Sequence, residues 1–402
     1  MSLVLAVGLA MVACTGEEDG ANSPNDAVSR DPQTPIVIAA GDPVVVGISA
    51  ALTGPVASLG LESRDAVLVG IERWKAENGA RIGGHEIEVY VEDDGCFETE
   101  VAAFAGERLL GRKGLVGVIG PMCSGGAREA IPVYAEAGIV MISGSATRTD
   151  LTLTQPEPGF FFRTSFTNAA EGVLQARYVI SQLHASTVYV VDNSEAYGQD
   201  LADWAQKTLE EGGRLVYREH IVQGSVDFSD LAGRIAADSP DAVIFEGFNP
   251  EAALLYRQLR DAGYSGPFVS SDGAASVRDF IEPLGEQAEG VVFAGCISAL
   301  PEDFLADYDR IHGHVPTTPF AGHLADAAHI LLDAVAQVAT EQDGSLVIDP
   351  MELREAVHNP KLLVGVSGII AFDENGDRVG NAETIGLAMC EVRDGEFALL
   401  TF

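Results

Sequence analysis

The chain alternates short runs of apolar, largely β-branched residues with longer stretches whose apolar positions recur every three or four residues. The short runs predict a first series of strands at residues 44–48, 87–91, 115–119 and 139–142. A second series is predicted at residues 187–191, 215–219, 242–245, 268–270 and 291–293. Helical periodicity separates the strands of each series, as in residues 62–78 and 196–211. Strands that alternate with helices predict an α/β protein with parallel sheets covered by helices on both faces.

Two such series without a linker between them predict two doubly wound lobes in one chain. The later helical stretches, residues 304–312 and 323–340, are expected to pack back on the first sheet. Three crossings between the lobes, near residues 162–165, 293–297 and 365–372, would then form a hinge. We therefore expect the following division: lobe 1 from residues 43–164 plus 296–366, and lobe 2 from residues 165–295 plus 367–402.

An apolar run of signal-peptide length occupies residues 2–13 and ends directly before Cys14. Small residues before a cysteine are typical of the bacterial lipobox. The pattern predicts a signal peptide at residues 1–13, a lipid on Cys14 and a flexible tether over residues 14–42. The alternative is an ordinary cleaved signal with an incidental cysteine. No later apolar run is long enough to span a bilayer, so membrane attachment is expected through the lipid alone.

The net charge and the cysteines bear on the partners of the protein and on its disulfides. A net charge of −36 over 402 residues argues against nucleic acid as a partner, because phosphates would be repelled. Export makes cysteines candidates for disulfides. Cys96 and Cys123 each follow a predicted strand, whereas Cys296 and Cys390 could either pair or remain small buried thiols.

Polar side chains gather where the predicted strands end, which is where open α/β sheets bind ligands. In the first lobe these are Ser124, at the start of a helix, and Ser145 and Thr147, and together they favour an anion. In the second lobe they are Tyr197 and Asp272, a phenol and a carboxyl group. The two lobes thus have the polarity of a zwitterion. Each residue also has a simpler interpretation: Ser124 and Thr147 as helix caps, Tyr197 as a surface aromatic, and Asp272 as a turn residue before Gly273.

Several motifs in this order resemble one family. They are Ala50-Ala51-Leu52-Thr53-Gly54-Pro55, Asp93-Asp94-Gly95-Cys96, Gly120-Pro121-Met122-Cys123-Ser124, Met141-Ile142-Ser143-Gly144-Ser145-Ala146-Thr147, Tyr197-Gly198 and Phe372-Asp373-Glu374-Asn375-Gly376. From residue 43 onward the chain resembles the periplasmic branched-chain amino-acid-binding proteins, which are type I solute-binding components of ABC transporters.

The resemblance implies a role for each matching residue. Ser124, Ala146 and Thr147 would hold the α-carboxylate of the ligand. Tyr197 and Asp272 would hold its ammonium, and Cys96 and Cys123 would form the disulfide of the family.

The side-chain pocket departs from that of the leucine binders. Leu59 stands where they have an aromatic residue, and Asp272 stands where they have glutamate. The pocket is expected from Leu59, Met122 and Phe248, and the ligand is expected to be an amino acid or a similar small zwitterion. The alternative is a ligand-sensing receptor of the same fold for an amide, urea or a small carboxylic acid.

The expected partners follow from the same resemblance. They are the small-molecule ligand and an ABC permease. The protein itself is expected to be a monomeric lipoprotein, either periplasmic or at the cell surface. No enzyme is expected, because no Gly-x-Gly-x-x-Gly follows a strand and no Gly-x-Ser-x-Gly is present. No cofactor or metal is expected, since no cysteine or carboxylate pattern completes the His312-Gly313-His314 stretch.

Overall fold

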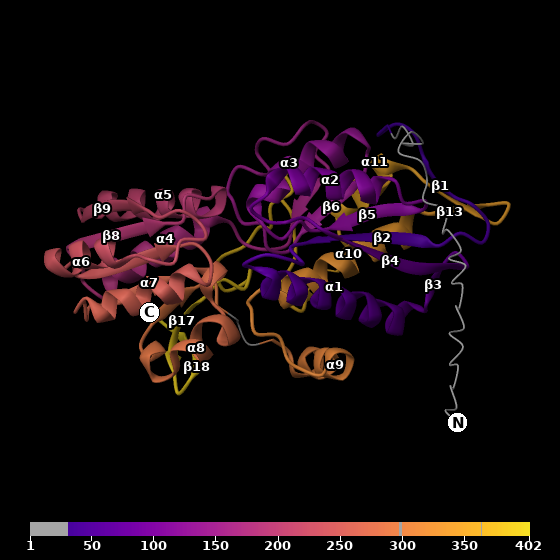
Figure 1. Ribbon diagram of the computed structural model, residues 1–402. Coiled ribbons are helices and arrows are strands. Elements are labelled where there is room, and N and C mark those ends of the chain that lie inside the picture. Colours follow the sequence, from indigo (N-terminus) through magenta and orange to yellow (C-terminus); the bar gives the residue numbers. More distant parts are fainter. Residues whose placement is uncertain (1–30, 297–299, 363) are drawn as a thin grey trace, which may run out of the picture.

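The computed structural model describes residues 31–296, 300–362 and 364–402. These residues form two α/β lobes side by side, joined by several connecting segments (Figure 1). The predicted signal peptide and Cys14 lie outside the described residues. No helix of the described part is long and apolar enough to cross a membrane.

The first lobe is built on a six-stranded sheet in the order β3-β4-β2-β5-β6-β7. All neighbours are parallel except β3 and β4. Its strands are β2 (Val44–Ala50), β3 (Arg81–Ile82), β4 (His85–Asp93), β5 (Leu115–Ile119), β6 (Val140–Ser143) and β7 (Phe161–Arg163). The central strands are buried along their whole length, because helices cover both faces of a parallel sheet.

Early and late segments of the chain share this lobe. Its helices are α1 (Ala57–Asn78), α2 (Thr99–Leu110), α3 (Ser124–Glu136), α9 (Glu302–His312), α10 (Ala321–Val338) and α11 (Pro350–His358). Helix α10 packs against α1, β5 and β6, which confirms the expected return of the later helices to the first sheet. The approach of α1 and α10 requires glycine at position 70, where a Cβ would lie 2.5 Å from the Ala325 carbonyl oxygen.

The second lobe contains a seven-stranded sheet in the order β18-β17-β12-β11-β10-β8-β9. Strands β8 to β12 are parallel, and β17 and β18 add an antiparallel edge. The strands are β8 (Thr187–Asp192), β9 (Leu215–His220), β10 (Ala242–Glu246), β11 (Phe268–Ser270), β12 (Val292–Ala294), β17 (Met389–Arg393) and β18 (Glu396–Leu400).

Helices cover both faces of this sheet as well. They are α4 (Asn168–Ser181), α5 (Ala196–Glu211), α6 (Ser229–Asp238) and α7 (Glu251–Asp261), followed by the short turns η1 (Asp272–Ala274), η2 (Val277–Ile281), α8 (Glu282–Leu284) and η3 (Gly285–Ala288). Apolar residues of α4 and α5 pack with Val188 and Val190, and those of α6 and α7 pack with Tyr189 and Val191. Alternate residues of one strand thus serve opposite faces, and the predicted fold class is confirmed.

The third connection between the lobes is long. The chain leaves the small hairpin of β15 (Val364–Gly365) and β16 (Gly368–Ile369) and enters the second sheet only at β17. The buried Arg378 in this connection donates to the Thr164 carbonyl of the first crossing at 2.8 Å and to the Ser367 carbonyl at 3.0 Å. Two crossings are therefore tied together by one guanidinium group.

Part of the predicted tether belongs to the folded first lobe. Residues 36–38, assigned to the flexible tether, form β1 (Ile36–Ile38) and pair with β14 (Ser345–Ile348), which also pairs with β13 (Thr340–Gln342). The pairing buries Ile38 in the core of the first lobe, which explains why this segment is held. The prediction of a flexible tether over residues 14–42 is therefore wrong for residues 36–38.

Candidate binding site between the lobes

A cavity lies where the carboxyl ends of both sheets face each other. The first lobe contributes Leu59, Met122, Cys123, Ser124, Ser145 and Phe320, and the second contributes Tyr197, Phe248, Asp272 and Gly273. All the residues predicted for the site line this cavity except Ala146 and Thr147. Cys123, Gly273 and Phe320 were not predicted. Phe320 directly precedes α10 and is brought here by tertiary packing alone.

This narrow cavity, of about 10 Å³, adjoins a wider chamber of about 230 Å³. Leu59, Asp272 and Gly273 line both spaces. The wider chamber is bounded by apolar residues of both lobes, Pro55, Val56, Pro250, Ala275 and Pro283, and by polar ones, Ser58, Asn249, Ser276, Arg278, Asp279 and Thr318. The narrow cavity has room for about one water-sized group, and the wider chamber supplies most of the space between the lobes.

The two first-lobe loops are tied to each other by serine hydroxyls. Ser143, the last residue of β6, donates to the Pro121 carbonyl at 2.8 Å and accepts from the Ala146 N–H at 3.0 Å. Ser145 donates to the Met122 carbonyl at 3.1 Å. Ala146 does not line the cavity, and its N–H already donates to Ser143.

The other two first-lobe residues present groups of different kinds. Ser124 begins α3, whose first N–H groups have no partner within the helix, and its hydroxyl accepts from the Arg148 N–H at 3.1 Å. The Thr147 hydroxyl is fully buried and has no hydrogen-bond partner among the described residues. Buried polar groups nearly always have a partner, so this hydroxyl is exceptional, but Thr147 does not line the cavity.

The second-lobe side of the cavity is a phenol and a carboxyl group in contact. Tyr197 lies in the first turn of α5, and Asp272 follows β11 at the start of η1. The Tyr197 hydroxyl hydrogen-bonds Asp272, and the Gly273 N–H donates to Asp272 at 2.7 Å. Phe248 packs on Tyr197 with ring centroids 4.9 Å apart, and Phe97 of the first lobe meets Phe248 at 5.5 Å.

Asp272 belongs to a group of buried acids. Glu171, in the first turn of α4, accepts from the Asp272 N–H at 3.0 Å, and Glu246 ends β10 nearby. Burial raises the pKa of Asp272 to about 7 and that of Glu246 to about 8. Neither Glu246 nor Glu171 was predicted as a site residue, and an acid in a first helical turn such as Glu171 is ordinarily a surface residue.

Direct contacts cross the cleft and hold the lobes together. The Arg148 guanidinium donates to the Ala196 carbonyl at 2.7 Å, and the Thr149 N–H donates to Asp200 at 2.8 Å. At the wider chamber Ser58 of α1 donates to Asp279 at 2.6 Å. The structure therefore has the lobes closed on each other.

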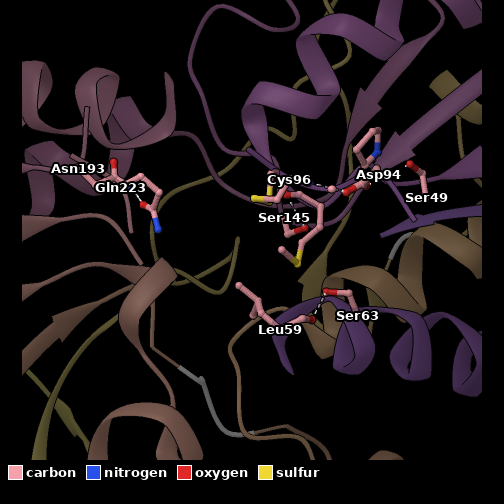
Figure 2. Close-up of a disulfide and its surroundings, with 12 residues drawn as sticks. Ser49, Leu59, Ser63, Asp94, Cys96, Ser145, Asn193 and Gln223 are labelled. Atoms are coloured by element: carbon pink, nitrogen blue, oxygen red, sulfur yellow. Dashed lines mark hydrogen bonds between the residues drawn. A yellow bond between two sulfur atoms is a disulfide. The ribbon is translucent and has the colours of Figure 1, made fainter. Parts of the chain in front are cut away.

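A disulfide joins Cys96 and Cys123, as the family resemblance implied, with Cα atoms 5.2 Å apart. It links the loop after β4 to the loop before α3. In Figure 2, Leu59 and Ser145 lie near this disulfide on the first-lobe side, with Asn193 and Gln223 on the opposite, second-lobe side. Behind it, Asp94 accepts from Cys96 N–H and from Ser49, and burial raises the pKa of Asp94 to about 6.

The open question about the other two cysteines is also answered. Cys296 and Cys390 form a second disulfide, with Cα atoms 6.0 Å apart. It ties the second crossing, just after β12, to β17. Among the described residues, no group of histidines, cysteines or carboxylates is arranged to hold a metal ion.

Two hinged α/β lobes with a polar cavity at their facing sheet ends define a binding protein of the type I periplasmic fold. The family described as "Periplasmic binding protein" matches residues 43–388, and the chain belongs to that family.

Individual relatives agree with this assignment. The Leu/Ile/Val-binding protein of Escherichia coli is 30% identical over 63% of this chain and 68% of its own length. The Leu/Ile/Val-binding protein BraC3 of Rhizobium johnstonii is 28% identical over 83% of this chain and 88% of its own. Among solved structures, the leucine-binding protein LivK of Thermotoga maritima superposes with a TM-score of 0.77 at 26% identity, covering 89% of this chain and 98% of that one.

Proposed function

We propose that this protein is the extracytoplasmic solute-binding component of an ABC transporter, and that it binds an amino acid between its lobes for delivery to a permease. The observation that carries the proposal is the opposed chemistry of the cavity. The first lobe offers the helix α3 N-terminus at Ser124 and the hydroxyl of Ser145, both of which line the cavity. The second lobe offers the carboxyl group of Asp272 beside Tyr197. Relatives named for binding leucine, isoleucine and valine support the same ligand class.

The binding groups lie on different lobes, which explains why closing of the lobes would depend on a bound ligand. A zwitterion that leaves water loses hydration at both ends, and burial is tolerated only when each end finds a partner. Those partners lie on different lobes. A ligand with both groups therefore stabilises the closed form more than the open form, and the closed form is the one a permease would recognise.

A ligand screen by thermal unfolding tests this function. L-leucine, L-isoleucine and L-valine are compared with leucinamide, which lacks the carboxylate, and with 4-methylpentanoate, which lacks the ammonium. A ligand at 100 times its dissociation constant is expected to add about 2.7 kcal/mol to the free energy of unfolding. We expect a shift with at least one amino acid and little shift with the two analogues. An equal shift with either analogue, or none with any amino acid, would contradict zwitterion binding.

We further propose that Cys14, outside the described residues, carries a lipid that anchors the protein to the membrane. The apolar run ending in Met-Val-Ala-Cys supports this. In a bacterial host, wild-type protein should partition with membranes, and Cys14→Ser should abolish that partitioning. Unchanged processing and fractionation of Cys14→Ser would contradict the anchor.

A further inference from the structure

Three buried carboxyl groups lie together on the second-lobe side of the cleft. Glu171, Glu246 and Asp272 have almost no exposed surface, and only Asp272 lines the cavity. Glu171 comes from α4, Glu246 from the end of β10 and Asp272 from η1, so the group is assembled from three separate elements. A buried carboxylate without a cation is costly, so this arrangement needs an explanation.

Glu171 contacts Asp272 directly. Its Oε1 accepts from the Asp272 backbone N–H at 3.0 Å, while its buried Oε2 has no hydrogen-bond partner among the described residues. A proton on this oxygen gives Glu171 a donor to offer to the neighbouring Asp272 carboxyl group. Glu246 instead accepts from Gln175 at 3.3 Å.

The backbone of the second crossing confines this pair. A Cβ at Gly295, where φ is +64°, would lie 2.6 Å from the Asp272 Cβ and 3.2 Å from Glu171 Oε1. The second crossing therefore lies directly against both side chains. A larger residue at position 295 would displace them, so the glycine leaves the space that the two side chains occupy.

No cation among the described residues contacts the pair. From α4 the neighbouring polar groups are Asn168 and Gln175, from α5 the Tyr197 hydroxyl, and from β10 Glu246. Arg218, the one cation that acts on Glu246, is bound to Asp192 at 2.6 Å, and His220 contacts the same aspartate. The first-lobe residues facing Asp272, which include Leu59, Met122 and Phe320, are neutral. Arg278 and Asp279 of the second lobe line the wider chamber that Asp272 also borders, and they pair with each other at 3.4 Å.

The titration of the acids follows from this surrounding. Burial first, and then the charges of Asp272 and Glu246, raise the pKa of Glu171 well above its usual range. Burial raises the pKa of Asp272 to about 7, against the hydrogen bonds from Tyr197, Gly273 and Glu171 that favour its charged form. Of the two acids, Asp272 is the one that lines the cavity, so it is the group whose charge a bound ligand can change.

We propose that Glu171 is a positioning residue for the ammonium subsite: it stays protonated, donates a hydrogen bond to Asp272 and accepts one from the Asp272 N–H, while the arriving ammonium expels the proton of Asp272. This inference rests on the proposed function. The exchange balances as one carboxylic acid plus one ammonium giving an ammonium–carboxylate pair and one proton, which leaves to solvent.

The exchange makes binding depend on pH with a definite sign. The ammonium favours the charged form of Asp272, so the pKa of Asp272 is about 7 in the empty site and lower in the complex. The contribution to affinity is therefore complete above pH 7 and is lost as the pH falls. Affinity is expected to weaken about tenfold for each unit below pH 7, or roughly hundredfold between pH 8 and pH 5.

Calorimetry at pH 6 in two buffers of different ionisation enthalpy measures the released proton directly. The probe is L-leucine or, if another amino acid gives the larger shift in the screen, that amino acid. We expect nearly one proton released per ligand at pH 6 and almost none at pH 8.5. Binding without proton release, and without pH dependence between pH 5 and pH 8, would overturn the inference. Absence of any amino-acid binding would instead contradict the proposed function.

Substitutions of Glu171 test whether it acts through its hydrogen bonds to Asp272 or only by filling space. Glu171→Gln keeps an oxygen that accepts from Asp272 N–H and an amide that donates to its carboxylate, so affinity within about threefold of wild type and an unchanged pH profile are expected. Glu171→Leu removes both hydrogen bonds and should weaken binding at pH 8 at least tenfold.

Glu246→Leu is the matched control, because it removes a buried carboxyl group of the same cluster that hydrogen-bonds Gln175 rather than Asp272. Binding by Glu246→Leu should stay within about threefold of wild type. Equal losses in the two leucine variants, or a flattened pH profile in Glu171→Gln, would show that Glu171 does not act through Asp272. Thermal unfolding of each variant verifies that it is folded.

Discussion

Asp272→Asn is expected to weaken amino-acid binding by at least about 3 kcal/mol, which is on the order of hundredfold. Asparagine has nearly the same volume, but it cannot be charged, so the ligand ammonium would be buried without a counter-charge. Calorimetry at pH 8, where the wild-type carboxylate is ionised, measures the loss.

The same substitution should not destabilise the fold. Burial raises the pKa of Asp272 from 3.8 to about 7, so stability falls as the pH rises between these two values, and the full loss is present at pH 8. The unfolding temperature of Asp272→Asn at pH 8 is therefore expected to equal or exceed that of wild type. Asp227→Asn, which makes the same charge change at an exposed position, is the control and should bind normally. Binding by Asp272→Asn within threefold of wild type would mean that Asp272 is an ordinary turn residue.

Arg163→Met is expected to lower the free energy of unfolding by about 3–5 kcal/mol, because it leaves a partly buried carboxylate without its partner. Arg163 is fully buried at the end of β7 and pairs with Asp377 of the third connection. Its Nη1 also donates to the carbonyls of Ala146 at 3.1 Å and Arg148 at 2.6 Å. Urea unfolding measures the change.

The loop that Arg163 supports also contains Ser145, which lines the cavity, so amino-acid binding should weaken together with stability. Arg393→Met is the matched control: Arg393 pairs with Glu391 at 2.6 Å on a strand surface and is largely exposed. Its loss should cost less than about 1 kcal/mol. An Arg163→Met protein that unfolds at the wild-type urea concentration would contradict the structural role.

Much of the fold could be predicted because it depends on local pattern. The strand predicted at residues 115–119 and the helix predicted at residues 196–211 match β5 and α5. Each was marked by the spacing of its own apolar residues along the chain. Boundaries were less well predicted where no stop or start signal is present. Helix α1 begins at Ala57 rather than at residue 62, in a stretch that has no side-chain cap.

The cavity was predictable for a related reason. Parallel strands bring their carboxyl ends to one edge, so polar residues that follow each strand meet there wherever they fall in the sequence. Ser124, Tyr197 and Asp272 were found in this way. Glu171 lies within α4, and its partner Asp272 is 101 residues further along the chain, so no local signal marks it.

The sequence by itself determined which segments form strands and helices, that they build two parallel sheets, and which strand ends carry polar groups, because these follow from residue type and period along the chain. Only the tertiary structure decided the partners that are distant in sequence, such as β1 with β14 and Cys296 with Cys390. It also decided which charged residues are buried. No local pattern marks Arg163 and Glu171 as buried, yet packing removes both from water, and burial raises the pKa of Glu171 well above its usual range.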